Sequence, residues 1–317
     1  MRLSLGALLG IAGVAAVVAR ALGQEPEWLG RAGSVALAML LSAALAGRTG
    51  GRPFVFGLLA GVCSTAAVVT RSDLLLGGAT VGVVAIGSVL AVLATVPATR
   101  IVDAVREVVV AGFVAGSSAL AAYGFAPHLD LARFEYLTLG LAIVGCFVMI
   151  YRLGAGLHGL GTRGLLTVVV GTVLLAFTVA YAELLRRYGT PDVAHTLAVW
   201  AQWTHDHLGG VPRPLVLLLG VPALTWGTHM RARRRQGWWV CLFGVAATAP
   251  IAQGLLDPTH TWTEAVLAAT YGMAGGVVLG VVLIWLDVWF TLPRSSARRA
   301  AAPVALRPEP RRTEPLL

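Results

Sequence analysis

Long runs of apolar residues alternate along this chain with short polar segments. A helix needs about 20 apolar residues to cross a hydrocarbon layer of roughly 30 Å, and it satisfies its backbone polar groups within one segment. The pattern therefore predicts an all-α, polytopic membrane bundle of about ten transmembrane helices. The predicted spans are residues 4–22, 32–47, 53–70, 74–97, 108–126, 134–151, 164–185, 214–230, 238–256 and 264–290.

The arginines between these runs fall mainly on alternate loops. If the N-terminus lies in the cytoplasm, 17 of the 24 arginines lie on the cytoplasmic side of the membrane and 7 lie on the outer side. Arginine is retained on the cytoplasmic side of membranes. We therefore expect both termini to be cytoplasmic, in a multi-pass protein of the plasma (inner) membrane of a bacterium. The first run also resembles a signal peptide, with Arg2, an apolar core and then Ala19-Arg20-Ala21; we expect an uncleaved helix.

Two segments do not fit the pattern of spans. The apolar centre of 190–209 is too short to cross, and its apolar residues recur at helical spacing, which predicts an amphipathic helix on the outer surface. Residues 293–317 are rich in proline, alanine and arginine, which predicts a disordered basic cytoplasmic tail. The transmembrane domain is therefore expected to cover residues 1–292.

Composition narrows the class of protein and its partners. Only 12% of the residues are charged, against about 25% in a soluble domain, which excludes a water-soluble fold. The net charge of +9 lies on loops that flank the spans and on the tail, so we expect contact with the bilayer and anionic lipid head groups and not with nucleic acid. The three cysteines form no CxxC pair, and no cofactor is expected.

Several local patterns predict how the helices begin and pack. Thr261 and Glu264 fit a capping box at the start of the last span. Glycines 272, 276 and 280 leave one stripe of that span without side chains, which favours a close helix contact. Most tryptophans, including Trp238 and Trp239, fall near predicted interfaces, as in an aromatic belt. No ionisable residue is predicted at the centre of a span, which argues against a typical proton-coupled antiporter.

A solute pathway would need a polar lining, and three neighbouring spans offer one. Proline in a span frees a backbone carbonyl, which can bind a ligand or a neighbouring helix. Helix packing therefore remains the alternative interpretation. The candidate lining residues are Thr167, Thr178, Tyr181, Pro222, Thr225, Thr248, Pro250 and Gln253.

Histidine and aspartate gather on neighbouring outer loops. Imidazole and carboxylate together can bind zinc or act as a base held by an acid. Residues i and i+2 diverge on a helix, so His205 and His207 can share a ligand only where the helix has ended. The alternative is a solvated histidine cluster. The candidates for this outer-face site are His205, Asp206, His207, Asp257 and His260.

The inner loop 152–164 offers Arg152, His158 and Arg163 for a phosphate or a lipid head group. It also contains a GxGxxG pattern. A dinucleotide fold has a β-strand before that pattern, whereas a predicted transmembrane helix precedes it here, so we do not expect nucleotide binding.

A transporter or permease-like protein for an unknown solute or lipid is the function we favour from these patterns. The length and the ten-span plan are similar to those of drug/metabolite transporters and auxin-efflux carriers in architecture alone, because none of their motifs is present. A non-catalytic membrane scaffold or assembly subunit, and a membrane-embedded enzyme with an outer-face histidine site, remain alternatives.

Overall fold

A computed structural model of the chain describes residues 5–21, 27–125, 130–153, 161–189, 191–291 and 309–316. These residues are helical, apart from turns, loops and the C-terminal segment. The helices are α1 (Leu5–Ala21), α2 (Glu27–Arg48), α3 (Pro53–Thr70), α4 (Asp73–Leu93), α5 (Ile101–Tyr123), α6 (Leu131–Arg152), α7 (Gly161–Tyr188), α8 (Pro191–Leu208), the π-helix η2 (Leu215–Gly220), α9 (Val221–Arg231), α10 (Gly237–Leu242), α11 (Val245–Leu256) and α12 (Trp262–Thr291).

Eight of the described helical segments are long and apolar enough to cross a membrane, as expected of a multi-pass membrane protein. Two of the ten predicted spans fall outside this number. In α1 the side chains are described only for part of the helix, which leaves the apolar stretch Gly10–Ala19, and the predicted span 214–230 is divided into η2 and α9. The count of ten and the orientation of the termini stay predictions.

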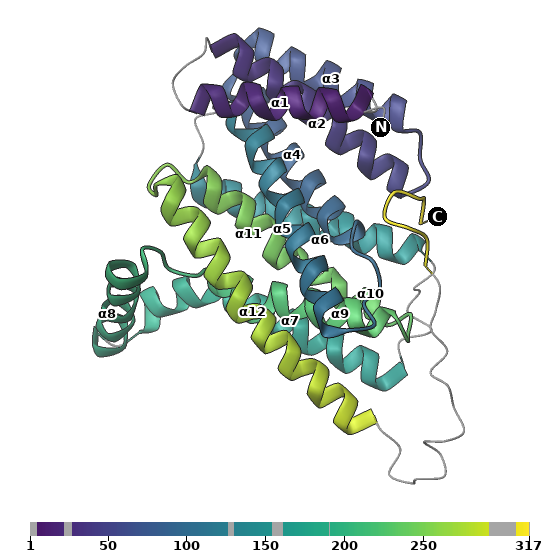
Figure 1. Cartoon of the computed structure of the whole chain (residues 1–317). Coiled ribbons are helices and arrows are strands. Elements are labelled where there is room, and N and C mark those ends of the chain that lie inside the picture. The colour runs from purple at the N-terminus through teal and green to yellow at the C-terminus, as the bar shows by residue number, and fades with distance from the viewer. Residues whose placement is uncertain are drawn as a thin grey trace.

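The helices form three groups that follow one another along the chain (Figure 1). Helices α1, α2 and α3 pack side by side, and α2 joins them to α4 and α5. The second group consists of α4, α5 and α6, and the third group, η2 to α12, packs against it from the other side. Helix α8 projects beyond one end of the bundle, which we call the histidine side because His205 and His260 lie there. Residues 309–316 lie at the opposite end, the tail side, with Arg48 and Arg231.

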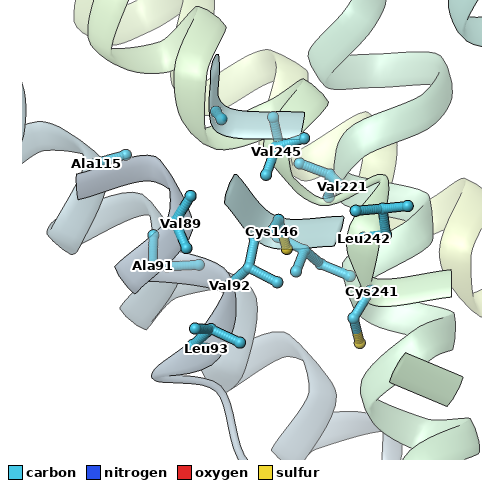
Figure 2. Packing of buried hydrophobic residues seen from close by; sticks show 14 of the residues in the cluster. Val89, Ala91, Val92, Leu93, Ala115, Cys146, Val221, Cys241, Leu242 and Val245 are labelled. Carbon is cyan, nitrogen blue, oxygen red and sulfur yellow. The ribbon is translucent and has the colours of Figure 1, made fainter. Parts of the chain in front are cut away.

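The largest apolar core joins the second group to the third. Val92 of α4, Cys146 of α6, Val221 of α9 and Val245 of α11 converge there and are almost fully buried (Figure 2). Large apolar side chains are instead exposed along α3, α7 and α12. In a water-soluble protein such continuous apolar faces would be unusual, whereas lipid covers them in a membrane. Examples are Phe54, Leu58, Val62, Leu166, Val170, Val278 and Trp285.

The local packing predictions had different outcomes. The capping box at α12 is confirmed, because the Thr261 N–H donates to Glu264 and the Glu264 N–H donates to Thr261 Oγ1. The glycine stripe of α12 is confirmed too: Cβ atoms added at Gly276 and Gly280 would stand 2.6 and 2.5 Å from side chains of α9. The placement of Trp238 and Trp239 near a membrane interface stays a prediction: both lie at the start of the candidate span Gly237–Leu256, and both side chains are buried against other helices.

The tail also differs from its prediction as a disordered segment. Residues 309–316 lie against the bundle and bond to Arg48, Glu107 and Arg231. The physical reason is that Glu309 and Glu314 are interspersed with Arg311 and Arg312, so this part of the tail carries both charges that buried partners require. Residues 292–308 and 317 lie outside the described residues.

Helices η2 and α11 cross closely at Gly220, which has no side chain. We expect Gly220→Ala to lower the free energy of unfolding by about 1–3 kcal/mol, because the new Cβ would stand 2.1 Å from the backbone nitrogen of Ala247. Gly116→Ala is the matched control: its Cβ meets nothing within 4 Å, so helix propensity alone stabilises that variant, by up to about 1 kcal/mol. Unfolding in detergent micelles measures both, and equal effects would contradict this close crossing.

Candidate functional site

Two consecutive interrupted helices cross near the centre of the third group. The first changes from π to α geometry between η2 and α9, with Pro222 at the start of α9. The second breaks between α10 and α11, and Pro250 inside α11 has no N–H to give to the carbonyl four residues earlier. Single π turns inside helices occur frequently at functional sites. Interrupted spans also carry the binding sites of many transporters, so polar groups along this pair are candidates for a binding site.

Three of the eight predicted pathway residues are buried in helix contacts. The hydroxyl of Thr225 donates to the Val221 carbonyl at 2.8 Å, and that of Thr248 donates to the carbonyl of Ser88 on α4 at 3.2 Å. Both threonines are fully buried, and Pro222 is buried beside them. These residues satisfy backbone groups between helices. The side chain of Thr167 lies outside the described ones.

The other predicted residues border one hollow on the histidine side. Its volume is about 280 Å³, and it lies between α6, α7, η2 and α11. The Gln253 amide donates across it to the Glu135 carbonyl at 3.0 Å and also bonds to the Thr138 hydroxyl. The predicted residues that line this hollow are Thr178, Tyr181, Pro250 and Gln253.

Arg213, just before η2, and Glu135 of α6 are charged residues that line this hollow. Its Nη1 lies 2.7 Å from Glu135 Oε1, and its Nη2 lies 3.6 Å from Asp257 Oδ2. A second hollow of about 100 Å³ shares Arg213 and Pro250 with the first. Burial raises the pKa of Asp257, but hydrogen bonds from Thr259 and the nearby His260 and Arg213 more than offset this, so the net shift of that pKa is downward. Asp257 therefore remains a negative partner for Arg213.

The histidine cluster divides between two environments. His205 and His260 flank Glu264 in the smaller hollow, each with a ring nitrogen 3.8 Å from a carboxylate oxygen, which is longer than a hydrogen bond. His207 stacks on the Trp203 ring instead, because α8 continues to Leu208 and the two histidines diverge on it. Asp206 is exposed on the same helix. Among the described residues, no three His, Cys, Asp or Glu side chains are arranged to hold a metal ion.

The tail side contains charged residues that the sequence analysis did not single out. Arg231, at the end of α9, is fully buried. Its guanidinium donates to the Thr95 hydroxyl at 2.8 Å and to the Thr95 carbonyl at 3.1 Å. It also lies over the Trp238 ring at 3.5 Å and pairs with Glu309 at 2.6 Å. The chain thus places Glu309, which is 78 residues away, against a buried arginine.

Glu107 is the second buried charge, and it lies in the second turn of α5. It accepts from the Val96 N–H at 2.9 Å and from Arg106 Nε at 3.1 Å. Both of its carboxylate oxygens also accept from Arg312 Nη2, at 2.9 and 2.8 Å. The predicted span of 108–126 left this residue in a loop. The structure begins α5 at Ile101, because tertiary partners satisfy the charges of its first turns.

Arg48 completes this arrangement at the end of α2. Its Nε donates to the Leu93 carbonyl at 2.9 Å, and its Nη1 donates to the carbonyls of Arg311 and Glu314, both at 2.6 Å. The Leu316 N–H donates back to the Arg48 carbonyl at 2.8 Å. We call Arg48, Thr95, Glu107 and Arg231 the tail-side cluster. The alternating charges of residues 309–314 are the sequence signal that would have revealed it.

The candidate for lipid contact is Arg152, at the tail-side end of α6. It borders a hollow of about 900 Å³ between α2, α3, α4 and α6, whose walls are largely apolar and include Leu59 and Met149. Cys63 also lines this hollow and is the exposed cysteine of the three. Of its predicted companions, His158 lies outside the described residues, and so does the side chain of Arg163.

Comparison of the chain with protein-family models, with curated proteins and with solved structures finds no match. Function is therefore inferred from the geometry of this chain alone.

The tail-side cluster makes a direct prediction about stability. Glu107→Gln is expected to lower the free energy of unfolding by about 3 kcal/mol, because it leaves the guanidinium of Arg312 without its buried carboxylate partner. Asp103→Asn on the same helix is the control, since Asp103 is half-buried and its carboxylate accepts from Arg100 and Thr99 in exposed contacts. Chemical unfolding of the full chain in micelles measures both. A change at Glu107 no larger than that at Asp103 would mean that the tail contributes little.

Proposed function

We propose that this multi-pass membrane protein is a transport protein whose solute pathway follows the interrupted helix pair η2–α9 and α10–α11. The observation that carries the proposal is that one interrupted segment has an ion-paired arginine at each end. Arg213 precedes η2 on the histidine side, and Arg231 ends α9 on the tail side. Residues between them pack without a continuous opening, as Thr225 and Thr248 illustrate. In this proposal the protein is a transporter in a closed state, and an ion-paired arginine closes each end of the pathway.

The histidine-side hollow is the proposed entry point for the solute. It combines an arginine, a carboxylate, a glutamine and hydroxyl groups beside a proline-interrupted helix. The Arg213 guanidinium is about one quarter exposed, so an entering anion can replace one of its two carboxylate partners without a large loss of charge pairing. Polar solutes that carry a negative group therefore fit this entry best.

We place the protein in a bacterial plasma membrane with its tail side toward the cytoplasm. The distribution of arginines supports this orientation, because the tail side carries Arg52, Arg100, Arg106 and the run 233–235.

Flux measurements test the proposed function. We expect proteoliposomes to take up at least one of four radiolabelled probes (phosphate, citrate, glucose or arginine) faster than protein-free vesicles do. We expect Arg213→Gln to lower this uptake by about tenfold, the equivalent of about 1.4 kcal/mol of binding. Arg133→Gln is the control, because Arg133 is exposed on the same side and pairs with Asp130. Uptake equal to that of protein-free vesicles for all four probes would count against transport.

A non-transporting membrane subunit is the second candidate function. The buried, fully bonded hydroxyls of Thr225 and Thr248 favour it, since they serve helix packing and not a wet pathway. Uptake that is absent in the flux measurements, together with a stable partner recovered by cross-linking in native membranes, would support this candidate.

We further propose that the hollow beside Arg152 holds an anionic lipid, with its acyl chain along the apolar wall and its head group at the guanidinium. Phosphatidylglycerol is then expected to slow the reaction of Cys63 with N-ethylmaleimide several-fold more than phosphatidylcholine does. Cys146 and Cys241 are buried and contribute no fast reaction. The Arg152→Gln variant should lose the difference between the lipids, whereas Arg52→Gln, exposed on the same side, should keep it. Equal protection by both lipids in the unmodified protein would rule this binding mode out.

A further inference from the structure

We propose that Arg48, Thr95 and Arg231 form a binding site for a carboxylate or phosphate group, and that residues 309–316 are an internal ligand which fills this site with Glu309. The site is built by the bundle and not by the tail. The Arg231 guanidinium is held by both oxygens of Thr95 and by the Trp238 ring. Arg48 is held by the Leu93 carbonyl. Both cations therefore keep their positions when the tail is absent.

The charge balance of the bundle shows which ligand such a site requires. Without residues 309–316, Glu107 still has Arg106 and the Val96 N–H as partners. Arg231 would lose Glu309, its carboxylate partner, and Arg48 would lose two carbonyl partners. The vacated site therefore carries an excess of positive charge, which a bound anion would neutralise. An anion is the ligand class that restores the balance.

The hydrogen-bonding atoms that lack a partner favour, as the ligand of this site, an oxyanion with more than two oxygens. Arg48 Nη2 and Arg231 Nε are buried and have no hydrogen-bond partner among the described residues, and neither has Glu309 Oε1. A carboxylate thus leaves donors unsatisfied on both arginines. Phosphate offers additional acceptor oxygens, and guanidinium groups bind it in a bidentate manner. Inorganic phosphate is therefore the better probe, and a carboxylate is the weaker one.

The tail competes for this site from within the chain. Glu309 belongs to the same chain as Arg231, so its binding is intramolecular and has an advantage over any free ligand. A free anion therefore displaces Glu309 from the unmodified protein only at high concentration. Removal of the Glu309 carboxylate alone should expose the site to anions at much lower concentration.

Thermal unfolding of full-length Glu309→Ala in detergent micelles tests the site directly. We expect this variant to melt below the unmodified protein, and we expect 10 mM sodium phosphate to raise its Tm by about 3 °C. Sodium chloride at equal ionic strength should give little change. Glu314→Ala is the matched control: its carboxylate accepts from the Arg311 N–H in the same segment and does not contact Arg231. Equal shifts with phosphate and chloride in Glu309→Ala would overturn the proposal.

Glu309→Gln keeps the shape of the side chain and serves where the alanine variant fails to fold. We expect it to bind [³²P]phosphate at least tenfold more tightly than the unmodified protein, and equal binding would also overturn the proposal. The anion site deepens the proposed transport function, because it names a solute class and a means of inhibition, but its test does not depend on flux. Phosphate binding without uptake of any probe would support the anion site and contradict the proposed transport function. Faster phosphate uptake by Glu309→Gln would support both.

Discussion

A guanidinium group taken out of water requires partners that replace its hydration, and Arg231 meets this requirement from three parts of the chain. The loop after α4 supplies Thr95, α10 supplies the Trp238 ring, and the C-terminal segment supplies Glu309. Removing one partner of a buried charge is costly, because the charge is then left uncompensated. The contact of the C-terminal segment with the bundle therefore follows from the burial of Arg231. The same reasoning applies to Glu107, whose carboxylate holds Arg312.

The two ends of the interrupted segment are linked because its middle is rigidly packed. Gly220 touches the backbone of α11, and Gly276 and Gly280 of α12 touch Val221 and Thr225. Packed cores have a few discrete arrangements and do not deform continuously. Movement of Arg213 at one end is thus expected to shift α9 as a unit and to reach Arg231 at the other. This physical connection is the reason to consider the two arginine networks together.

Hydropathy was sufficient to predict the helical class and many boundaries. Helix α3 coincides with the predicted run 53–70, because Pro53 begins it and polar residues follow it. The interruptions at η2 and between α10 and α11 were not predicted, since an average over apolar residues does not distinguish π from α hydrogen bonding. Glu107 was assigned to a loop because its neighbours are charged, and its partner Arg312 lies 205 residues away, beyond any local pattern. Thr178 and Gln253 were predicted as part of a polar lining, whereas no local pattern predicted that Arg213 would lie beside them.

The two ends of the proposed pathway are closed by different forces. On the histidine side the hollow is bounded by α7. The described surface of this helix is mostly apolar and exposed, and the helix makes few contacts with the bundle. Lipid can therefore replace much of the contact surface between α7 and the bundle. On the tail side the closure consists of buried ion pairs, and these break only when other charges take their place. Displacement of α7 can therefore widen the hollow on the histidine side, where an entering anion replaces one of the carboxylate partners of Arg213. On the tail side the requirement is stricter, because the buried Arg231 needs an anion in place of Glu309, whereas Glu107 keeps Arg106 and the Val96 N–H as partners.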